Sequence, residues 1–295
     1  MAKKVDLGSL KARKAAGEKH TMLTAYDFPF ARLLDEAGID SVLVGDSLGN
    51  VVLGYPDTRP VTMDEMLHHT RAVGRAVTSA LLIGDMPFMS YNVTLEEALR
   101  NGGRFLKEAG ADLVKLEGGG QVAGIVAAMV RAGIPVCGHL GLTPQTASQL
   151  GGYRVQGRTA EAAMRILEDA LRLEDAGASI LVLECVPDRV ASRIAERLAI
   201  PVVGIGAGPG CDGQVLVLHD MLGLTASGPC PKFVRVFAEL GQAAREALAA
   251  YRDAVRAGTF PGPAESFTIA DDELEELLRL ERAGAPMGQP REVGR

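Results

Sequence analysis

The sequence lacks tryptophan, is poor in aromatic residues (4%) and has only four cysteines among its 295 residues. This composition argues against an aromatic-rich β-sandwich. The cysteines form no CxxC pair and have no metal-like spacing, so the sequence predicts free thiols in a reducing compartment. A catalytic cysteine is the less favoured interpretation.

Long apolar runs and an excess of positive charge are also missing. The longest stretch without a charged residue, 132–153, is rich in glycine and polar residues and cannot span a bilayer. The first residues include lysines but no apolar segment after them, so we expect no secretory signal and a cytoplasmic location. The net charge of −6 argues against general nucleic-acid binding. Any anionic ligand must therefore meet a local cationic group.

Short apolar segments separated by helical ones are what the sequence contains in abundance. They predict eight strands, near residues 21–25, 41–45, 80–84, 112–116, 134–138, 179–183, 201–205 and 215–219. These segments are apolar throughout, as parallel strands covered on both faces are. Eight parallel strands alternating with helices favour a closed (β/α)8 barrel, and a doubly wound open sheet is the alternative.

Segments with helical periodicity lie between most of the strands, for example at 62–77, 95–107, 159–174 and 188–198. An Ala-Gly pair precedes four of the strands, at 37–38, 109–110, 132–133 and 176–177. Glycine is suited to the left-handed conformation that ends a helix, so each pair predicts a helix end.

The whole chain is expected to form one domain, residues 1–295, with an N-terminal helix and a barrel core at about 20–258. A long helix is predicted at about 231–257 and an acidic helix from Asp271. Residues 259–295 are expected to be a C-terminal extension and tail.

Ionisable residues follow five consecutive predicted strands: Asp46, Asp85, Glu117, His139 and Glu184. In a barrel the carboxyl ends of the strands form one rim, where barrel active sites are built. Neighbouring strands lie about 4.8 Å apart, so the first two carboxylates can converge on one cation. Oxygen ligands favour Mg²⁺. A single aspartate after a strand, such as Asp46 taken alone, is better explained as a helix cap, but two on adjacent strands favour the cation site.

Lys115 and Glu117 are two apart on one predicted strand, so they point to the same face. They form either a buried ion pair or, through the lysine, a site for a substrate carboxylate, and the sequence leaves both open. Glu184 ends an apolar run and is a candidate general base, the alternative being a helix cap. His139 either orients a substrate or hydrogen-bonds a neighbouring loop.

Six motifs in this order carry a family resemblance: VGDSLG at 44–49, GDMPF at 84–88, VKLEG at 114–118, GHLGLTPQ at 138–145, LECVP at 183–187 and GIGAG at 204–208. Together they resemble the 3-methyl-2-oxobutanoate (ketopantoate) hydroxymethyltransferase family. The resemblance extends from about residue 10 to about residue 267. The resemblance implies a (β/α)8 barrel of the phosphoenolpyruvate/pyruvate type. It also implies transfer of a hydroxymethyl group from 5,10-methylenetetrahydrofolate to 3-methyl-2-oxobutanoate, giving 2-dehydropantoate for pantothenate synthesis.

The resemblance further implies Mg²⁺ and a homodecamer made of two rings of five. It assigns metal contacts to Asp46, Asp85 and Glu117, and substrate contacts to Asp46, Ser47, Asp85 and Lys115. It makes Glu184 the proton acceptor. His139 is a further candidate for substrate binding because of its place on the rim.

Two alternatives remain at this point. One is a metal-dependent C–C lyase of the isocitrate-lyase type, since Cys137-Gly138-His139 is similar to a motif of that group. Here Ile-Pro-Val precedes the motif where that group has paired lysines, and dependence on folate would separate the two. The other is a non-enzymatic barrel that serves as an assembly module. Loss of a carboxylate at 46, 85 or 184 would have favoured it, and all three are present.

Overall fold

The computed structural model describes residues 4–225 and 231–284. The chain divides into two units, Met1–Gly241 and Gln242–Arg295. None of the helices in the described ranges has the length and apolarity that crossing a membrane requires. The single domain expected over 1–295 stays a prediction.

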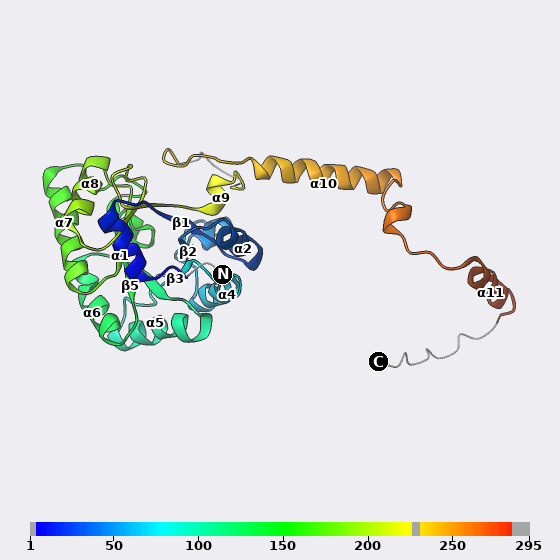
Figure 1. Ribbon diagram of the computed structural model, residues 1–295, viewed down its shortest axis with the longest axis horizontal. Coiled ribbons are helices and arrows are strands. Elements are labelled where there is room, and N and C mark those ends of the chain that lie inside the picture. The colour runs from blue at the N-terminus through cyan, green and yellow to red at the C-terminus, as the bar shows by residue number, and fades with distance from the viewer. Residues whose placement is uncertain (1–3, 226–230, 285–295) are drawn as a thin grey trace. The chain divides into compact units, whose positions relative to one another are not determined.

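The first unit contains a closed barrel of eight parallel strands, each paired with the next, and the last paired with the first (Figure 1). The strands are β1 His20–Thr24, β2 Ser41–Val44, β3 Leu81–Asp85, β4 Leu113–Glu117, β5 Val136–Gly141, β6 Ile180–Glu184, β7 Val202–Ile205 and β8 Gly213–Leu216. This confirms the predicted barrel and excludes the open sheet. The strand bounds differ from the predicted ones by a few residues at most.

Helices surround the strands, and Figure 1 shows α4 to α8 along the outside of the barrel. The helices of the first unit are α1 Leu7–Ala16, α2 Phe28–Glu36, α3 Leu48–Val51, α4 Met63–Gly74, α5 Leu95–Ala109, α6 Ala123–Arg131, α7 Ala160–Asp175, α8 Asp188–Arg197 and α9 Leu218–Met221. Short 3₁₀ turns lie at Gly120–Val122 and Pro144–Leu150.

Local chemistry fixes where these helices begin and end. The side chains of Thr62, Thr94 and Thr159 accept a backbone hydrogen bond at the start of α4, α5 and α7, which satisfies an otherwise free N–H group. The glycines of the four Ala-Gly pairs all have φ between 74° and 97°. The predicted left-handed helix ends are therefore confirmed.

Two apolar clusters stabilise the barrel. The larger one lies between strands and helices and includes Phe105 of α5 and Met129 of α6. The smaller one fills the barrel interior with residues such as Ile83 and Val203, and Leu10 of α1 joins it. Arg13 and Lys14 of α1 form ion pairs with Asp40 and Asp212, which directly precede β2 and β8, so α1 closes the amino end of the barrel. The carboxyl end is left for other side chains.

Interior-facing positions alternate along each strand, and on several strands the last of them is ionisable. On β6, Ile180 and Val182 belong to the interior cluster and Glu184 follows at the same spacing. On β4, Leu113 points to the interior, and Lys115 and Glu117 lie on the same side of the strand at the next two alternate positions. The interior is therefore apolar at one end and charged at the other.

The long helix predicted at 231–257 is shorter in the structure, where α10 spans Leu240–Ala257. The preceding segment makes hydrogen bonds outside a helix. The N–H of Phe237 donates to the carbonyl of Met221, and the N–H of Leu240 donates to that of Leu222. These bonds to the end of α9 replace the helical ones, so the helix begins nine residues later than predicted.

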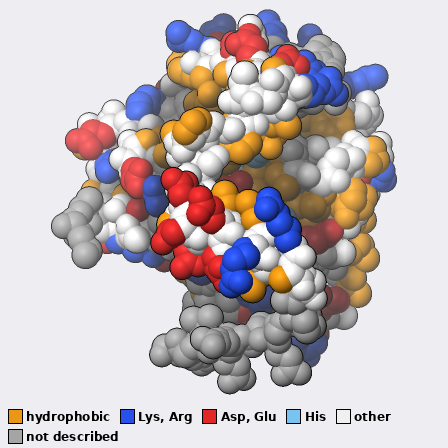
Figure 2. Space-filling model, turned by 90° about the vertical axis from the view of Figure 1, so that its right-hand side faces the viewer, with side chains coloured by type: hydrophobic (Ala, Val, Ile, Leu, Met, Phe, Trp, Pro, Cys, Tyr) orange, Lys and Arg blue, Asp and Glu red, His pale blue; other side chains and the backbone are white. Residues whose placement is uncertain are grey.

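The second unit consists mainly of α10 and the acidic helix α11, Asp271–Arg282, which begins at the predicted residue. Several of its apolar side chains are exposed, among them Leu248, Tyr251, Val255, Leu274 and Leu277. On the face drawn in Figure 2, hydrophobic side chains reach the surface beside acidic and basic ones.

Three of the four cysteines lie in the described ranges, and Cys137, Cys185 and Cys211 are all free thiols, as predicted. Cys230 lies outside the described residues.

Candidate functional site

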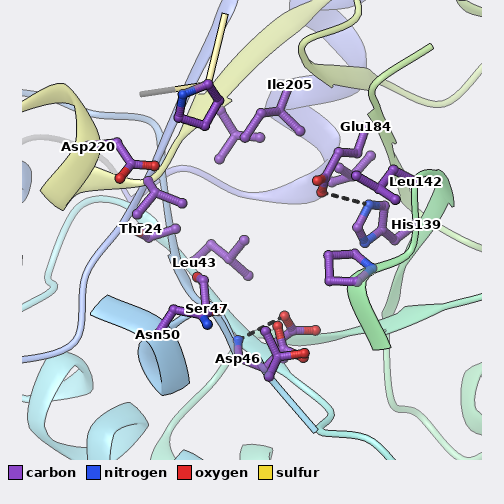
Figure 3. A pocket seen from close by; sticks show the side chains of 18 of the residues that line it. Thr24, Leu43, Asp46, Ser47, Asn50, His139, Leu142, Glu184, Ile205 and Asp220 are labelled. Atoms are coloured by element: carbon purple, nitrogen blue, oxygen red, sulfur yellow. Dashed lines mark hydrogen bonds and ion pairs between the residues drawn. The ribbon is translucent and has the colours of Figure 1, made fainter. Parts of the chain in front are cut away.

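The carboxyl end of the barrel opens into a cavity of about 490 Å³ in the first unit. The seven candidate residues from the sequence all line it: Asp46, Ser47, Asp85, Lys115, Glu117, His139 and Glu184. Figure 3 shows Asp46 and Ser47 on one side of the cavity and the His139–Glu184 pair on another. The strand ends thus bring together side chains that are up to 138 positions apart in the sequence.

Asp46 and Asp85 are direct neighbours. The backbone N–H of Asp46 donates to Oδ2 of Asp85 at 3.1 Å, and both residues are buried. Gly84, just before Asp85, lets β3 pack closely against α5, since a Cβ there would lie 2.4 Å from the ring of Phe105. The two carboxylates therefore lie next to each other, as predicted.

Lys115 forms a buried ion pair with Asp85, the two atoms Nζ and Oδ1 being 2.8 Å apart. The parallel register places these residues opposite each other on β4 and β3. The ion pair left open by the sequence therefore exists, but its closest partner is Asp85 and not Glu117. Lys115 also lines the cavity, so it is accessible to a small anion there.

His139 lies between two glutamates. Its Nδ1 is 3.4 Å from Oε1 of Glu117 and 3.3 Å from Nζ of Lys115, and its Nε2 is 3.3 Å from Oε2 of Glu184 (Figure 3). Of these side chains only that of Glu184 is partly exposed, at 17%. His139 therefore contacts the predicted base directly, and does not merely support a loop.

Burial and mutual repulsion dominate the electrostatics of the cavity. Burial, followed by the charges of Asp85 and Glu117, holds the pKa of Asp46 well above its usual range. Burial also raises the pKa of Asp85, although the charge of Lys115 works against this shift. Burial and Lys115 lower the pKa of His139, but the nearby carboxylates of Glu117 and Glu184 outweigh them and raise it to about 9.

The pKa of Lys115 is raised because the charges of Asp85, Glu117 and Asp46 together outweigh the effect of burial. The lysine therefore stays charged at neutral pH. Three buried carboxyl groups surround this one ammonium group, so the cluster lacks positive charge.

Two residues that the sequence analysis missed hold this cluster in place. Nε2 of Gln145 donates to Oδ2 of Asp46 at 3.0 Å and to the carbonyl of Met86 at 2.9 Å, and its backbone N–H donates to Oε2 of Glu117 at 3.1 Å. The hydroxyl of Tyr91 donates to Oε1 of Gln145 at 2.7 Å. These bonds use Oδ2 of Asp46 and Oε2 of Glu117, while Oε1 of Glu117 lies 3.4 Å from Nδ1 of His139.

The sequence held only a weak signal for these residues. Gln145 ends the motif at 138–145, but a glutamine after a proline in a loop suggests no role by itself. Tyr91 lies between strand and helix without any pattern around it. A third contact, part-buried, between the hydroxyls of Tyr26 and Ser47 at 2.8 Å, orients the predicted substrate-binding serine.

The donor set fits a divalent cation of the Mg²⁺ type. Oxygen ligands predominate, buried Oε1 of Glu117 has no hydrogen-bond partner, and the cluster has more carboxyl groups than cations. Within the described residues, no group of three Asp, Glu, His or Cys side chains is arranged around one point as for an ion. Mg²⁺ commonly keeps several waters and few protein ligands, so two carboxylates are compatible with it.

Comparison with known proteins gives the family. The family model described as ketopantoate hydroxymethyltransferase matches residues 4–263. The chain belongs to the ketopantoate hydroxymethyltransferase family. The 3-methyl-2-oxobutanoate hydroxymethyltransferase of Heliobacterium modesticaldum is 55% identical over 94% of this chain and 100% of that protein. That of Moorella thermoacetica is 57% identical over 90% of this chain and 98% of that protein.

Solved structures with the same fold are more distant from this family member. Phosphonopyruvate hydrolase in complex with oxalate and Mg²⁺ has a TM-score of 0.59 at 16% identity, covering 97% of this chain and 98% of that one. The 2,3-dimethylmalate lyase, a member of the phosphoenolpyruvate mutase/isocitrate lyase superfamily, has a TM-score of 0.55 at 18% identity, with 94% and 96% covered. At this identity they confirm the predicted type of barrel and nothing more.

The family decides between the predicted functions. This chain is a ketopantoate hydroxymethyltransferase family enzyme of pantothenate synthesis, acting on a small molecule. The non-enzymatic assembly module is therefore excluded. The lyase alternative shares the fold, but the family match favours the transferase.

We expect Gln145→Met to destabilise the first unit. The substitution keeps the side-chain volume but leaves Oδ2 of Asp46, the carbonyl of Met86 and the hydroxyl of Tyr91 short of a partner. Leaving a buried polar group unpaired costs about 1–3 kcal/mol, so the free energy of unfolding should fall by at least that much in urea titrations. Gln214→Met, at an exposed position of β8, should change it by less than about 0.5 kcal/mol. Equal losses in both variants would contradict this.

Proposed function

We propose that this enzyme adds the one-carbon unit of 5,10-methylenetetrahydrofolate to C3 of 3-methyl-2-oxobutanoate, after Glu184 has removed the C3 proton. The observation that carries the proposal is the charged cavity: carboxyl groups and Lys115 lie at its base, and Glu184 lies at its side, partly exposed. A keto acid held by its carboxylate and keto oxygens at the base presents its C3 to that side.

Asp46 and Asp85 would hold Mg²⁺, and Glu117 would support them through the Gln145 backbone. When bound, Mg²⁺ supplies a Lewis acid that polarises the keto group and stabilises negative charge on its oxygen. The chain itself supplies charge compensation, since Lys115 lies in the cavity and offsets the carboxylate of the keto acid. Ser47, oriented by Tyr26, and His139 complete the substrate contacts.

Glu184 is suited to be the base by its position at the end of β6. The next residue, Cys185, has φ of 49°, an unusual conformation for a residue with a side chain, and turns the chain away after the glutamate. His139 lies 3.3 Å from the carboxylate and fixes its direction. The proton of C3 passes to this carboxylate. Water would release the one-carbon unit of the donor as formaldehyde, both C–N bonds breaking and tetrahydrofolate leaving. The electron pair left on C3 would then attack this carbon, and the oxygen of the new hydroxymethyl group would take up the proton.

The size of the cavity supports a second substrate. A volume of about 490 Å³ lies within the range of roughly 300–1,000 Å³ typical of sites for drug-sized ligands. A five-carbon keto acid fills only part of such a volume. The remainder is available to the folate donor.

Assembly and location belong to the same proposal. The exposed apolar side chains of α10 and α11 are compatible with burial between subunits, and the family resemblance points to a homodecamer. We propose a decamer of two five-membered rings in the cytoplasm. The proposed partners of the chain are small molecules and its own copies, with no nucleic acid and no membrane.

One assay tests the activity as a whole. Formation of 2-dehydropantoate from 3-methyl-2-oxobutanoate is followed with and without methylenetetrahydrofolate and with and without Mg²⁺. The proposal requires both for product. Cleavage of a larger 2-oxo acid precursor or product formation without folate would favour the lyase alternative.

The metal site predicts the behaviour of Asp85→Asn. Loss of this charge should severely weaken Mg²⁺ binding in the presence of the keto acid, because only one of the two adjacent carboxylates remains. Calorimetric titration measures it, and circular dichroism should show a folded barrel. Asp64→Asn, whose parent side chain is 87% exposed, is the control and should bind as the wild type does. Unchanged Mg²⁺ affinity in the Asp85 variant would remove this residue from the site.

The base assignment predicts a separable half-reaction. With Mg²⁺ and no folate, the wild type should exchange the C3 hydrogen of the keto acid with deuterium from solvent. Glu184→Gln keeps the side-chain size but cannot accept the proton, so the exchange rate should fall by about 10²–10⁴-fold while keto-acid binding persists. Proton NMR measures the exchange. Glu196→Gln, an exposed position on α8, is the control. Exchange at the wild-type rate in Glu184→Gln would make this glutamate structural and His139 the next candidate.

The proposed assembly predicts a solution mass of ten times the chain mass of 31.0 kDa. Light scattering coupled to size exclusion, at micromolar protein concentration, measures it. A stable monomer would refute the proposed assembly and would leave the proposed activity unaffected.

A further inference from the structure

The charged cluster occupies only one end of the cavity. Across from it lies Asp220, on the short helix α9 that follows β8, and Figure 3 shows this carboxylate facing the cavity near Thr24, opposite Glu184 and His139. Its Oδ1 accepts a hydrogen bond from the hydroxyl of Thr225 at 2.5 Å. Within the described ranges, its Oδ2 has no hydrogen-bond partner and the residue has no ion pair.

Asp220 has a defined position relative to the barrel. The hydroxyl of Thr24, at the end of β1, accepts a hydrogen bond from the N–H of Leu218 at 3.0 Å, and both residues are buried. This bond ties the start of α9 to the strand. The helix that carries Asp220 is therefore fixed to the barrel at its first residue, and the carboxylate lines the cavity.

Charge divides the cavity into two ends. Lys115 is the only lysine or arginine among its described lining residues, and it lies in the cluster with Asp85. Apolar side chains line the space around both ends, including Leu43, Ile205 and Phe233. With the proposed cation bound beside Lys115, that end of the cavity would attract an anionic keto acid, whereas the carboxylate of Asp220 would repel it. The second end therefore suits a ligand that brings hydrogen-bond donors and a flat apolar ring.

We propose that Asp220 binds the pterin ring of the folate donor by accepting hydrogen bonds from its N3–H and its 2-amino group. These two N–H groups lie side by side on one edge of the ring and match the two oxygens of a carboxylate, as the parallel donors of a guanidinium do. The apolar walls, with Phe233, receive the faces of the ring. The inference rests on the proposed folate donor and names the residue that would recognise it.

Asp220→Asn tests the inference, because an amide keeps the size of the side chain but has only one acceptor oxygen and no charge. We expect the Kd for tetrahydrofolate, measured by calorimetry on the full-length enzyme, and the KM for methylenetetrahydrofolate to rise at least about tenfold. The KM for the keto acid should change less than about twofold. Deuterium exchange without folate needs only the other end of the cavity, and it shows that the variant is folded.

A modified ligand tests the same contact in the unaltered protein. A tetrahydrofolate analogue without the 2-amino group should bind at least about tenfold more weakly to the wild type, and this difference should largely vanish in Asp220→Asn. Asp188→Asn, an exposed position at the same end of the barrel but outside the cavity lining, should behave as the wild type does.

The outcomes separate this inference from the proposed function. If the wild type requires methylenetetrahydrofolate and Asp220→Asn binds tetrahydrofolate as tightly as the wild type, the assignment of Asp220 is wrong and the activity stands. Equal loss of folate binding and of folate-free exchange also overturns it, since Asp220 then supports the whole cavity. A wild type that forms product without any folate refutes the proposed function itself.

Discussion

Buried charge at the carboxyl end of the barrel is the constraint on which the rest of the structure depends. Asp46, Asp85 and Glu117 are buried around a single ammonium group, that of Lys115. Such groups destabilise a fold unless partners and hydrogen bonds compensate for lost water. The apolar interior below them, closed by Leu10, stabilises the barrel enough to tolerate the cluster. The remaining deficit of positive charge is what makes the site suited to a divalent cation.

The cluster is positioned by backbone geometry more than by side-chain flexibility. Parallel register places Asp85 beside Lys115 and Glu117 beside His139, so that the contacts between strands also arrange the charges. Gln145 then links two strand ends through one side chain and one N–H group. A site held in this way loses little entropy on binding a ligand, because its groups are already ordered.

Local patterns predicted the barrel and the rim, because strands, helix ends and strand-terminal charges each have a signature within a few residues. The contacts among the rim residues could not be predicted from such local patterns. The pairing of Lys115 with Asp85 depends on the register between two strands, and the bond from Gln145 to Asp46 joins residues 99 positions apart. The late start of α10 depends on bonds from residues 237 and 240 to α9, which helical periodicity cannot reveal.

The apolar lining of the cavity gives its charges their effect. Leu43, Val182 and Ile205 keep the effective dielectric constant low, so charges at either end act more strongly on a ligand than they would in water. With Lys115 and the proposed cation at one end and the carboxylate of Asp220 at the other, the two ends would favour ligands of different charge. An anion and a neutral ring with N–H donors can then occupy the cavity together without competing for one place. This arrangement suits the proposed reaction of two substrates. It arises from the side chains at the carboxyl ends of β3 and β4 and from Asp220 of α9, the helix after β8.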